Sequence, residues 1–197
     1  AVFTDGTGGG DSSPAFSHVV FTGNGGLLGG AVRIDGSDGN SSPSFTDVTF
    51  SGNLAKSGGA VGVAVDSAQG ISSPRFVNVT FSGNTAQYGG AVAVFNGQSA
   101  QAISSPVFIN VTFSGNRATM MGGAVYHEGA YGTGASSFSN VTFDGNTGVA
   151  LYASSFNRDN PPRFMIRNSV LWGNRGGETT EDGSATIVLQ GSLVDVN

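Results

Sequence analysis

The sequence predicts an all-β protein, a single-stranded right-handed parallel β-helix (β-solenoid) of about six coils, each of roughly 30 residues with three short strands. The peptide Val-Thr-Phe-Ser-Gly-Asn recurs with Gly-Gly-Ala-Val a few residues behind it. The last Asn of successive copies recurs at intervals of 29, 31, 32, 30 and 28 residues, at Asn24, Asn53, Asn84, Asn116, Asn146 and Asn174. Right-handed connections are the general rule between parallel strands.

The repeat occupies the whole chain, which predicts one β-helix domain over residues 1–197. The opening residues, from Ala1 to Gly6, copy the pattern from Ala31 to Gly36, so the chain starts in mid-repeat. We therefore expect it to be a segment of a longer protein. A solenoid without caps exposes its last coil, so we also expect coils of successive molecules to stack end to end.

The unit over residues 72–94 shows how one coil is built. Its first strand begins after Pro74 and turns Phe76 inward, since proline is acceptable at the start of a strand. The alternation then changes parity at Asn78, a residue type that tolerates the left-handed conformation of a tight corner. The second strand turns Phe81 inward and ends at Ser-Gly-Asn, and the third strand follows Gly89 and its neighbouring glycine.

Equivalent residues of successive coils should stack about 4.8 Å apart. The corner column contains His18, Asp47, Asn78, Asn110, Asn140 and Asn168. One predicted phenylalanine ladder is Phe16, Phe45, Phe76, Phe108, Phe138 and Phe164. The other is Phe21, Phe50, Phe81, Phe113 and Phe143, continued by Leu171. Inward valines complete the interior at Val19, Val48, Val79, Val111, Val141 and Val170, and at Val32, Val61, Val92, Val125 and Leu151.

The repeat weakens after Asn174. The stretch from Glu178 to Gly183 is rich in polar and acidic residues, and we expect an exposed acidic loop before a last strand near Ala185 to Leu189.

Charge and hydropathy exclude several partners. The net charge is −5 and Lys56 is the only lysine, which argues against binding to nucleic acid or to an anionic membrane. No apolar run approaches the roughly 20 residues of a membrane-spanning helix, so we expect no membrane insertion by this segment. The chain has no cysteine and therefore no thiolate site.

The paired tetrapeptides resemble the repeats of the chlamydial polymorphic outer-membrane proteins, which combine Gly-Gly-Ala-(Ile/Val/Leu) with Phe-x-x-Asn. The pairs here are Phe21–Asn24 with Gly29–Val32, Phe50–Asn53 with Gly58–Val61, Phe81–Asn84 with Gly89–Val92, and Phe113–Asn116 with Gly122–Val125. The longer form Ser-Ser-Pro-x-Phe-x-Asn-Val-Thr-Phe-Ser-Gly-Asn is similar to secreted bacterial β-helix proteins of the pectate-lyase-like superfamily. The resemblance implies an extracellular or cell-surface location and either an adhesive or structural role or a polysaccharide enzyme.

The sequence identifies no catalytic, cofactor-binding or metal-binding site. The weak catalytic candidates are Tyr126, Glu128 and Tyr152, on the outward face of the Gly-Gly-Ala-Val strands, where the tyrosines could stack on a sugar. His127 alternates inward and is interpreted as a satisfied interior histidine. The stretch from Asp35 to Asn40 resembles a calcium loop without the later bidentate Glu, so a turn is favoured and calcium is the one candidate ion.

Two further outward faces carry regular patterns. Small residues at Ala60, Gly62, Ala64, Ala91 and Ala93 predict a smooth face for lateral packing of another solenoid. Hydroxyls at Thr49 and Ser51, Thr80 and Ser82, and Thr112 and Ser114, with Thr142 beside Asp144, predict a flat lattice. Such a lattice suits binding to ice or another ordered surface, although β-propensity alone also explains it.

The favoured interpretation is a non-enzymatic extracellular β-solenoid of a surface, adhesive or filament-forming bacterial protein. Its expected partners are other copies of itself, end to end or side by side, and a cell-surface or polysaccharide ligand. The alternatives are a polysaccharide lyase or glycoside hydrolase, and an ice or ordered-surface binder.

Overall fold

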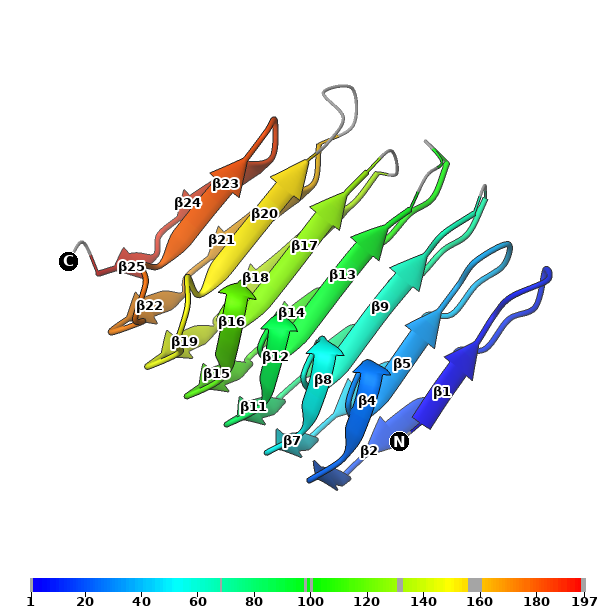
Figure 1. The fold of residues 1–197 in the computed structure, drawn as a ribbon, viewed down its shortest axis with the longest axis horizontal. Coiled ribbons are helices and arrows are strands. Elements are labelled where there is room, and N and C mark those ends of the chain that lie inside the picture. Colours follow the sequence, from blue (N-terminus) through cyan, green and yellow to red (C-terminus); the bar gives the residue numbers. More distant parts are fainter. Residues whose placement is uncertain are drawn as a thin grey trace.

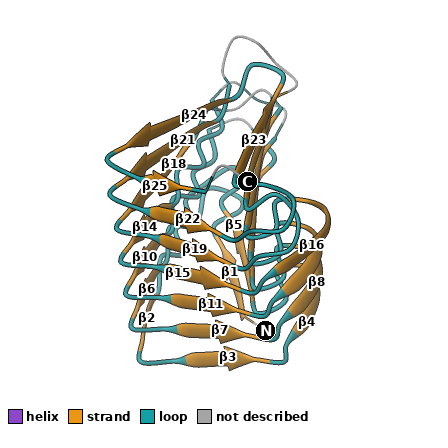
Figure 2. Cartoon of the chain, turned by 90° about the vertical axis from the view of Figure 1, so that its left-hand side faces the viewer, coloured by secondary structure: helices purple, strands orange, loops and turns teal. Residues whose placement is uncertain are grey.

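A computed structural model describes residues 2–67, 69–97, 99, 101–130, 133–155 and 161–195. The described chain is a parallel β-solenoid of about six turns that has the predicted right hand, and it forms three seven-stranded sheets (Figures 1 and 2). Sheet 1 contains β1 (Val2–Asp5), β5 (Val32–Asp35), β9 (Val61–Val65), β13 (Val92–Asn96), β17 (Val125–Gly129), β20 (Leu151–Ser155) and β23 (Thr179–Asp182). Sheet 2 contains β2 (Ala15–Ser17), β6 (Ser44–Thr46), β10 (Arg75–Val77), β14 (Val107–Ile109), β18 (Ala135–Ser139), β21 (Arg163–Arg167) and β24 (Thr186–Gln190). Sheet 3 contains β3 (Val20–Thr22), β7 (Thr49–Ser51), β11 (Thr80–Ser82), β15 (Thr112–Ser114), β19 (Thr142–Asp144), β22 (Val170–Trp172) and β25 (Leu193–Val194).

A fourth, four-stranded sheet was not predicted. It contains β4 (Gly25–Leu28), β8 (Leu54–Ser57), β12 (Thr85–Tyr88) and β16 (Arg117–Met121). Four of the coils therefore have four strands each instead of the predicted three. We call these strands the covering sheet, and they stand beside sheet 1 in Figure 2.

The phenylalanine ladders of the interior are confirmed with one correction. Rings of neighbouring coils stack with centroids 4.8 to 5.0 Å apart in both ladders. The prediction for Phe164 was wrong, because Phe138 pairs with Ile166 while Phe164 pairs with Ser136. Phe164 lies four residues before its corner and not two, so it keeps the inward parity and packs edge-on against Phe138 at 5.5 Å.

The valine column has a similar error at its end. Phe143 pairs with Leu171 and Thr142 with Val170, so Ser169 takes the position predicted for Val170. The hydroxyl of the buried Ser169 accepts a hydrogen bond from the amide of Val141 at 3.1 Å. The other inward column, from Val32 to Leu151, pairs as predicted.

The predicted corner column is confirmed by its backbone. All six corner residues have positive φ, between 50° and 57°, at His18, Asp47, Asn78, Asn110, Asn140 and Asn168. The exposed Asn78 also bonds its neighbours in the column, Asp47 at 3.1 Å and Asn110 at 3.2 Å. Polar side chains at these positions therefore serve the turn between sheets 2 and 3.

A second asparagine column, which follows sheet 3, is buried and forms a hydrogen-bonded ladder. The side-chain Oδ1 of Asn84 accepts from the backbone N–H and from Nδ2 of Asn53, at 3.0 and 2.9 Å. Its Nδ2 donates to Oδ1 of Asn116 at 2.9 Å and to the carbonyl of Phe50 at 3.0 Å. All the hydrogen-bonding capacity of this buried amide is used, and Asn53, Asn116 and Asn146 repeat the arrangement.

Glu178 ends this ladder, which corrects the prediction of an exposed acidic loop. The buried Glu178 carboxylate accepts hydrogen bonds from the backbone N–H and from Nδ2 of Asn174, in place of the next asparagine. Burial raises the pKa of this carboxyl. The residues that follow it form β23, because the chain there continues sheet 1 and does not leave the solenoid.

The covering sheet overturns the prediction of a small-residue face for lateral packing. Gly58 and Gly89, with φ of 65° and 62°, fold each covering strand back over sheet 1. A Cβ at Gly62 would lie 2.5 Å from Leu28, which shows how closely the covering side chains approach. Ala60 and Ala91 pack in the interior core and do not belong to an outward face. All five residues of the predicted face are buried, so no second solenoid can reach them: Ala60, Gly62, Ala64, Ala91 and Ala93.

His127 faces inward, as its position in the strand predicts. It is fully buried, and its Nδ1 lies 2.9 Å from the hydroxyl of Ser136. Its Nε2 lies 3.3 Å from Nδ2 of Asn96, which can only donate, so Nε2 accepts and the ring is neutral. Burial lowers the pKa of His127 to about 3.

The asparagine ladder predicts that two asparagines of one coil, Asn84 and Asn78, contribute very differently to the free energy of unfolding. Asn84→Ala removes four hydrogen bonds and leaves buried donors and a carbonyl without partners, so we expect it to lower the free energy of unfolding by about 4 kcal/mol. The measurement is urea denaturation followed by the fluorescence of the single tryptophan.

Asn78→Gly is the matched control for this variant. It keeps the left-handed corner and loses only exposed hydrogen bonds, so its cost should stay below about 1 kcal/mol. Equal costs for the two variants would contradict the structural role of the buried ladder.

His127 predicts an acid-sensitive stability. The folded protein keeps it neutral down to a pKa of about 3, whereas the unfolded chain binds a proton below about pH 6.5. Stability is therefore complete above pH 6.5 and falls as the pH drops toward 3. Lowering the pH from 7 to 5 should therefore reduce the free energy of unfolding by about 2 kcal/mol through this histidine, as measured by urea denaturation.

In His127→Gln this part of the pH dependence should disappear. His18→Gln, which removes an exposed histidine, is the control and should retain it. If the free energy of unfolding depends on pH equally in His127→Gln and in the wild type, the buried histidine is not the source of that dependence.

Candidate functional site

The candidate site lies where the covering sheet ends. The covering strands stop at β16, whereas sheet 1 continues through β20 and β23 (Figure 1). Under the covering strands the outer face of sheet 1 has small residues such as Gly62 and Ala93. At the end of the cover the same two columns carry Tyr126, Glu128 and Tyr152. Three large side chains therefore gather near the coil where the covering layer stops.

Tyr126 and Glu128 line a groove with a volume of about 460 Å³, which we call the tyrosine groove, and the Tyr152 ring borders it beside Tyr126. One wall comes from the covering sheet, with Lys56, Ser57, Tyr88 and Met121. The other comes from sheet 1, with Phe95, Tyr126, Glu128, Ser154 and Asp182. A cavity of this size is typical of small-molecule sites.

The register of sheet 1 arranges the polar residues of the groove in one column. Glu128 pairs with Ser154, and Ser154 pairs with Asp182. Successive strands lie ~4.8 Å apart, so the two carboxylate residues are separated by ~9.6 Å at their Cα atoms with a hydroxyl between them. The column runs along the solenoid axis.

Aromatic rings lie beside this column. The Tyr126 ring centroid is 5.5 Å from that of Tyr88, 5.8 Å from that of Phe95 and 6.0 Å from that of Tyr152. Tyr126 itself is only 3% exposed, whereas Tyr88 and Tyr152 are half-buried and present ring surface to solvent. Tyr126 thus forms the base of the cluster, and the other two tyrosines form its accessible edges.

Tyr126 is tied to the carboxylate column. Its hydroxyl donates to Oε2 of Glu128 at 2.6 Å. Burial, followed by the Glu128 hydrogen bond, raises the pKa of Tyr126 far above its ordinary value, so the phenol stays protonated and holds Glu128 in place. Burial and the charge of Asp182 also raise the pKa of Tyr152, which places that ring within the field of the second carboxylate.

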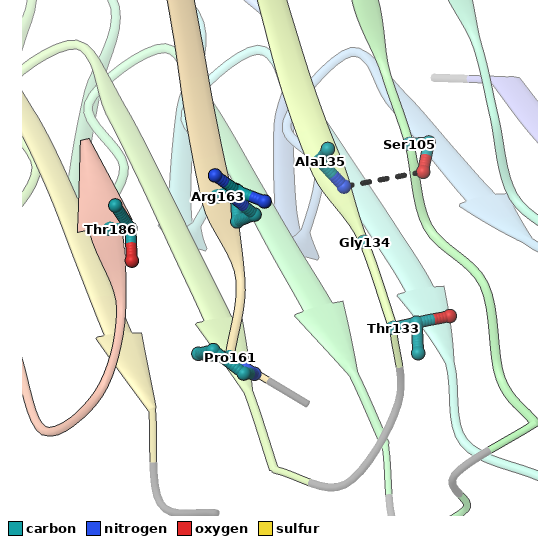
Figure 3. A pocket seen from close by; sticks show the side chains of 7 residues that line it. All are labelled: Ser105, Thr133, Gly134, Ala135, Pro161, Arg163 and Thr186. Atoms are coloured by element: carbon teal, nitrogen blue, oxygen red, sulfur yellow. Dashed lines mark hydrogen bonds between the residues drawn. The ribbon is translucent and has the colours of Figure 1, made fainter. Parts of the chain in front are cut away.

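The tyrosine groove continues into a smaller hollow of about 230 Å³. The two share Phe95 and Glu128, and the hollow also contacts Asp66 and Asn96. A separate cavity of about 530 Å³ lies near sheet 2 (Figure 3). Its described lining has Arg163 as the one charged side chain, beside Ser105 and Thr133, and it lacks the aromatic rings of the groove. We therefore take the tyrosine groove as the candidate site.

The hydroxyl lattice has the predicted register on sheet 3. Thr80 pairs with Thr49 and Thr112, and the serines two residues further on pair with one another. These side chains are partly exposed and belong to strands whose central phenylalanine is buried. Binding to an ordered surface stays a prediction.

The first carboxylate of the predicted calcium loop already has partners within the protein. Asp35 is buried, pairs with Arg33 at 2.7 Å and accepts hydrogen bonds from the amide and hydroxyl of Ser37. Within the described ranges, no group of three or more histidine, aspartate or glutamate side chains is placed to hold a metal ion. Calcium binding stays a prediction.

The sequence identified Tyr126, Glu128 and Tyr152, and the structure brings all three together. It missed Tyr88 and Asp182. Tyr88 belongs to the unpredicted covering sheet, and Asp182 was placed in a loop. The signal for Asp182 was the 28-residue spacing from Asn146 to Asn174, because the same offset aligns Ser154 with Asp182.

Comparison with known proteins identifies the repeat. Residues 47–63, 78–94 and 110–128 match the Chlamydia polymorphic membrane protein repeat, and together they make up about a quarter of the chain. Each match begins at a corner residue and contains the sheet 3 strand, the covering strand and the first half or more of the sheet 1 strand. No curated protein and no solved structure gives a significant match. The part of the chain that is described contains no helix that could span a membrane. Three coils of this parallel β-solenoid are therefore similar to the Chlamydia polymorphic membrane protein repeat.

Proposed function

We propose that this chain is an adhesive segment of a bacterial cell-surface protein. The observation that supports it is the match of three coils to the polymorphic membrane protein repeat, in a solenoid whose exposed tyrosine groove has no role in forming the core. The stacked coils form a stiff support, and the groove presents side chains that the ladders do not use. Adhesion needs both a rigid scaffold and such a surface.

Adhesion is tested with beads coated with the folded protein. The beads should attach to cultured epithelial cells several-fold more than albumin-coated beads, and the soluble protein should compete. Protein unfolded in urea before coating is the control for fold. Attachment equal to that of albumin on epithelial cells would contradict the proposal.

One observation favours a second candidate function, a glycoside hydrolase. Glu128 and Asp182 lie in one outward column, two strand spacings apart, and inverting glycosidases use two carboxyl groups set apart with room for a water molecule between them. A lyase for acidic polysaccharides is less well supported, because the groove has two carboxylates and a single lysine.

The hydrolase proposal predicts slow release of reducing sugar from a neutral polysaccharide such as xylan or cellulose. Glu128→Gln and Asp182→Asn should each reduce that rate at least 100-fold. Trp172→Ala, at an exposed aromatic residue of sheet 3, is the control and should leave it unchanged. If neither xylan nor cellulose releases reducing sugar, the protein does not hydrolyse these polysaccharides.

We propose self-association as a further property. Large apolar residues are exposed on several coils, among them Leu27, Leu54, Met120 and Leu193. Exposed apolar side chains favour contact with a second copy of the chain.

A further inference from the structure

The tyrosine groove has the composition of a site for a sugar ring. Two accessible rings, Tyr88 in its lining and Tyr152 at its border, flank Tyr126 in a row that crosses from the covering sheet to sheet 1. The C–H face of a pyranose is apolar and packs well on an aromatic ring, whereas its hydroxyls need hydrogen-bonding partners at the edge. A groove for a purely apolar ligand would not place carboxylates along one wall.

The polar column supplies those partners. Glu128 and Asp182 stand at the two ends of this column, on either side of the buried Ser154, so two acceptors are available ~9.6 Å apart, a span that hydroxyl groups on different rings of a sugar chain can reach. Glu128 is already oriented, because the Tyr126 hydroxyl occupies Oε2 and leaves Oε1 for a ligand. An acceptor held in advance costs less ordering entropy on binding.

Charge restricts the kind of sugar. The groove has two carboxylates against the single ammonium group of Lys56, and the chain has a net charge of −5. Uronic acids and sulfated sugars would be repelled, whereas neutral sugars are accepted and an amino sugar gains an ion pair.

From the juxtaposition of the tyrosine row with the Glu128–Ser154–Asp182 column, we propose that the groove binds a neutral or amino-sugar glycan, with a ring on Tyr152 and hydroxyl or amino groups on the two carboxylates. The proposal rests on the adhesive function and names the ligand class for it. The glycan chain would lie along the solenoid axis, across β17, β20 and β23.

The test is isothermal titration calorimetry of the purified protein with three trisaccharides: chitotriose, its deacetylated form and trigalacturonate. We expect millimolar or tighter binding of the first two, with the deacetylated sugar tighter, and none of trigalacturonate at about 10 mM. Tyr152→Ala should weaken binding at least tenfold, and Asp182→Asn should remove the preference for the deacetylated sugar.

Trp172→Ala is the matched control, because it removes an exposed aromatic ring of sheet 3 and should not change binding. Circular dichroism checks that each variant is folded. The proposal is overturned if neither chitotriose nor its deacetylated form binds, if trigalacturonate binds most tightly, or if Tyr152→Ala binds like the wild type. If coated beads still attach to cells in any of these cases, the adhesive function holds and its ligand is a different one.

Discussion

The buried asparagine ladder is the constraint on which the rest of the structure depends. The side-chain Nδ2 of each internal asparagine donates to the asparagine of the next coil. Its Oδ1 accepts from the asparagine of the previous coil. Because these bonds reach only one strand spacing, the coils must stack in register at that point. The phenylalanine ladder of sheet 3 lies three residues before these asparagines and keeps the same register.

The ladder also explains where the repeat can vary in length. The spacing between successive ladder asparagines ranges from 28 to 32 residues, yet the turns on both sides of sheet 3 keep the same length in the first four coils. The variation falls in the loops between sheet 1 and sheet 2, such as the segment between β9 and β10, and in the covering segment, which is one residue longer at β16 and shorter after Asn146. Loops tolerate such changes because their backbones do not belong to the ladders.

The covering sheet connects this scaffold to the candidate site. Its strands lie between the ladder asparagines and the glycine pairs, and left-handed glycines such as Gly58 return the chain over sheet 1. In the coil after β16 a single bridge from Arg117 to Thr147 replaces the covering strand. The next coil has only the bridge from Thr147 to Arg175, so the groove lies where the cover ends.

Most of the fold followed from the sequence because the phenylalanines and the corner residues repeat with the parity of their strands. The ladder asparagines were taken for turn residues, since a Ser-Gly-Asn signal does not show that the amide faces inward. The covering strands escaped notice because segments such as Thr85–Tyr88 lack the alternation of half-buried strands. Phe164 was misplaced by two residues, a shift that conserves inward parity and is invisible to a pattern of period two.

Site-resolved amide hydrogen exchange tests the ladder most directly. The backbone amides of Asn53, Asn84, Asn116 and Asn146 lie outside the strands, and each donates to the side chain of the next asparagine. They should be among the most protected amides of the protein, and Asn116→Ala should speed exchange at Asn84 while the amide of Asn146 remains slow. Exchange of these amides at the rate of exposed loops in the wild type would contradict the account.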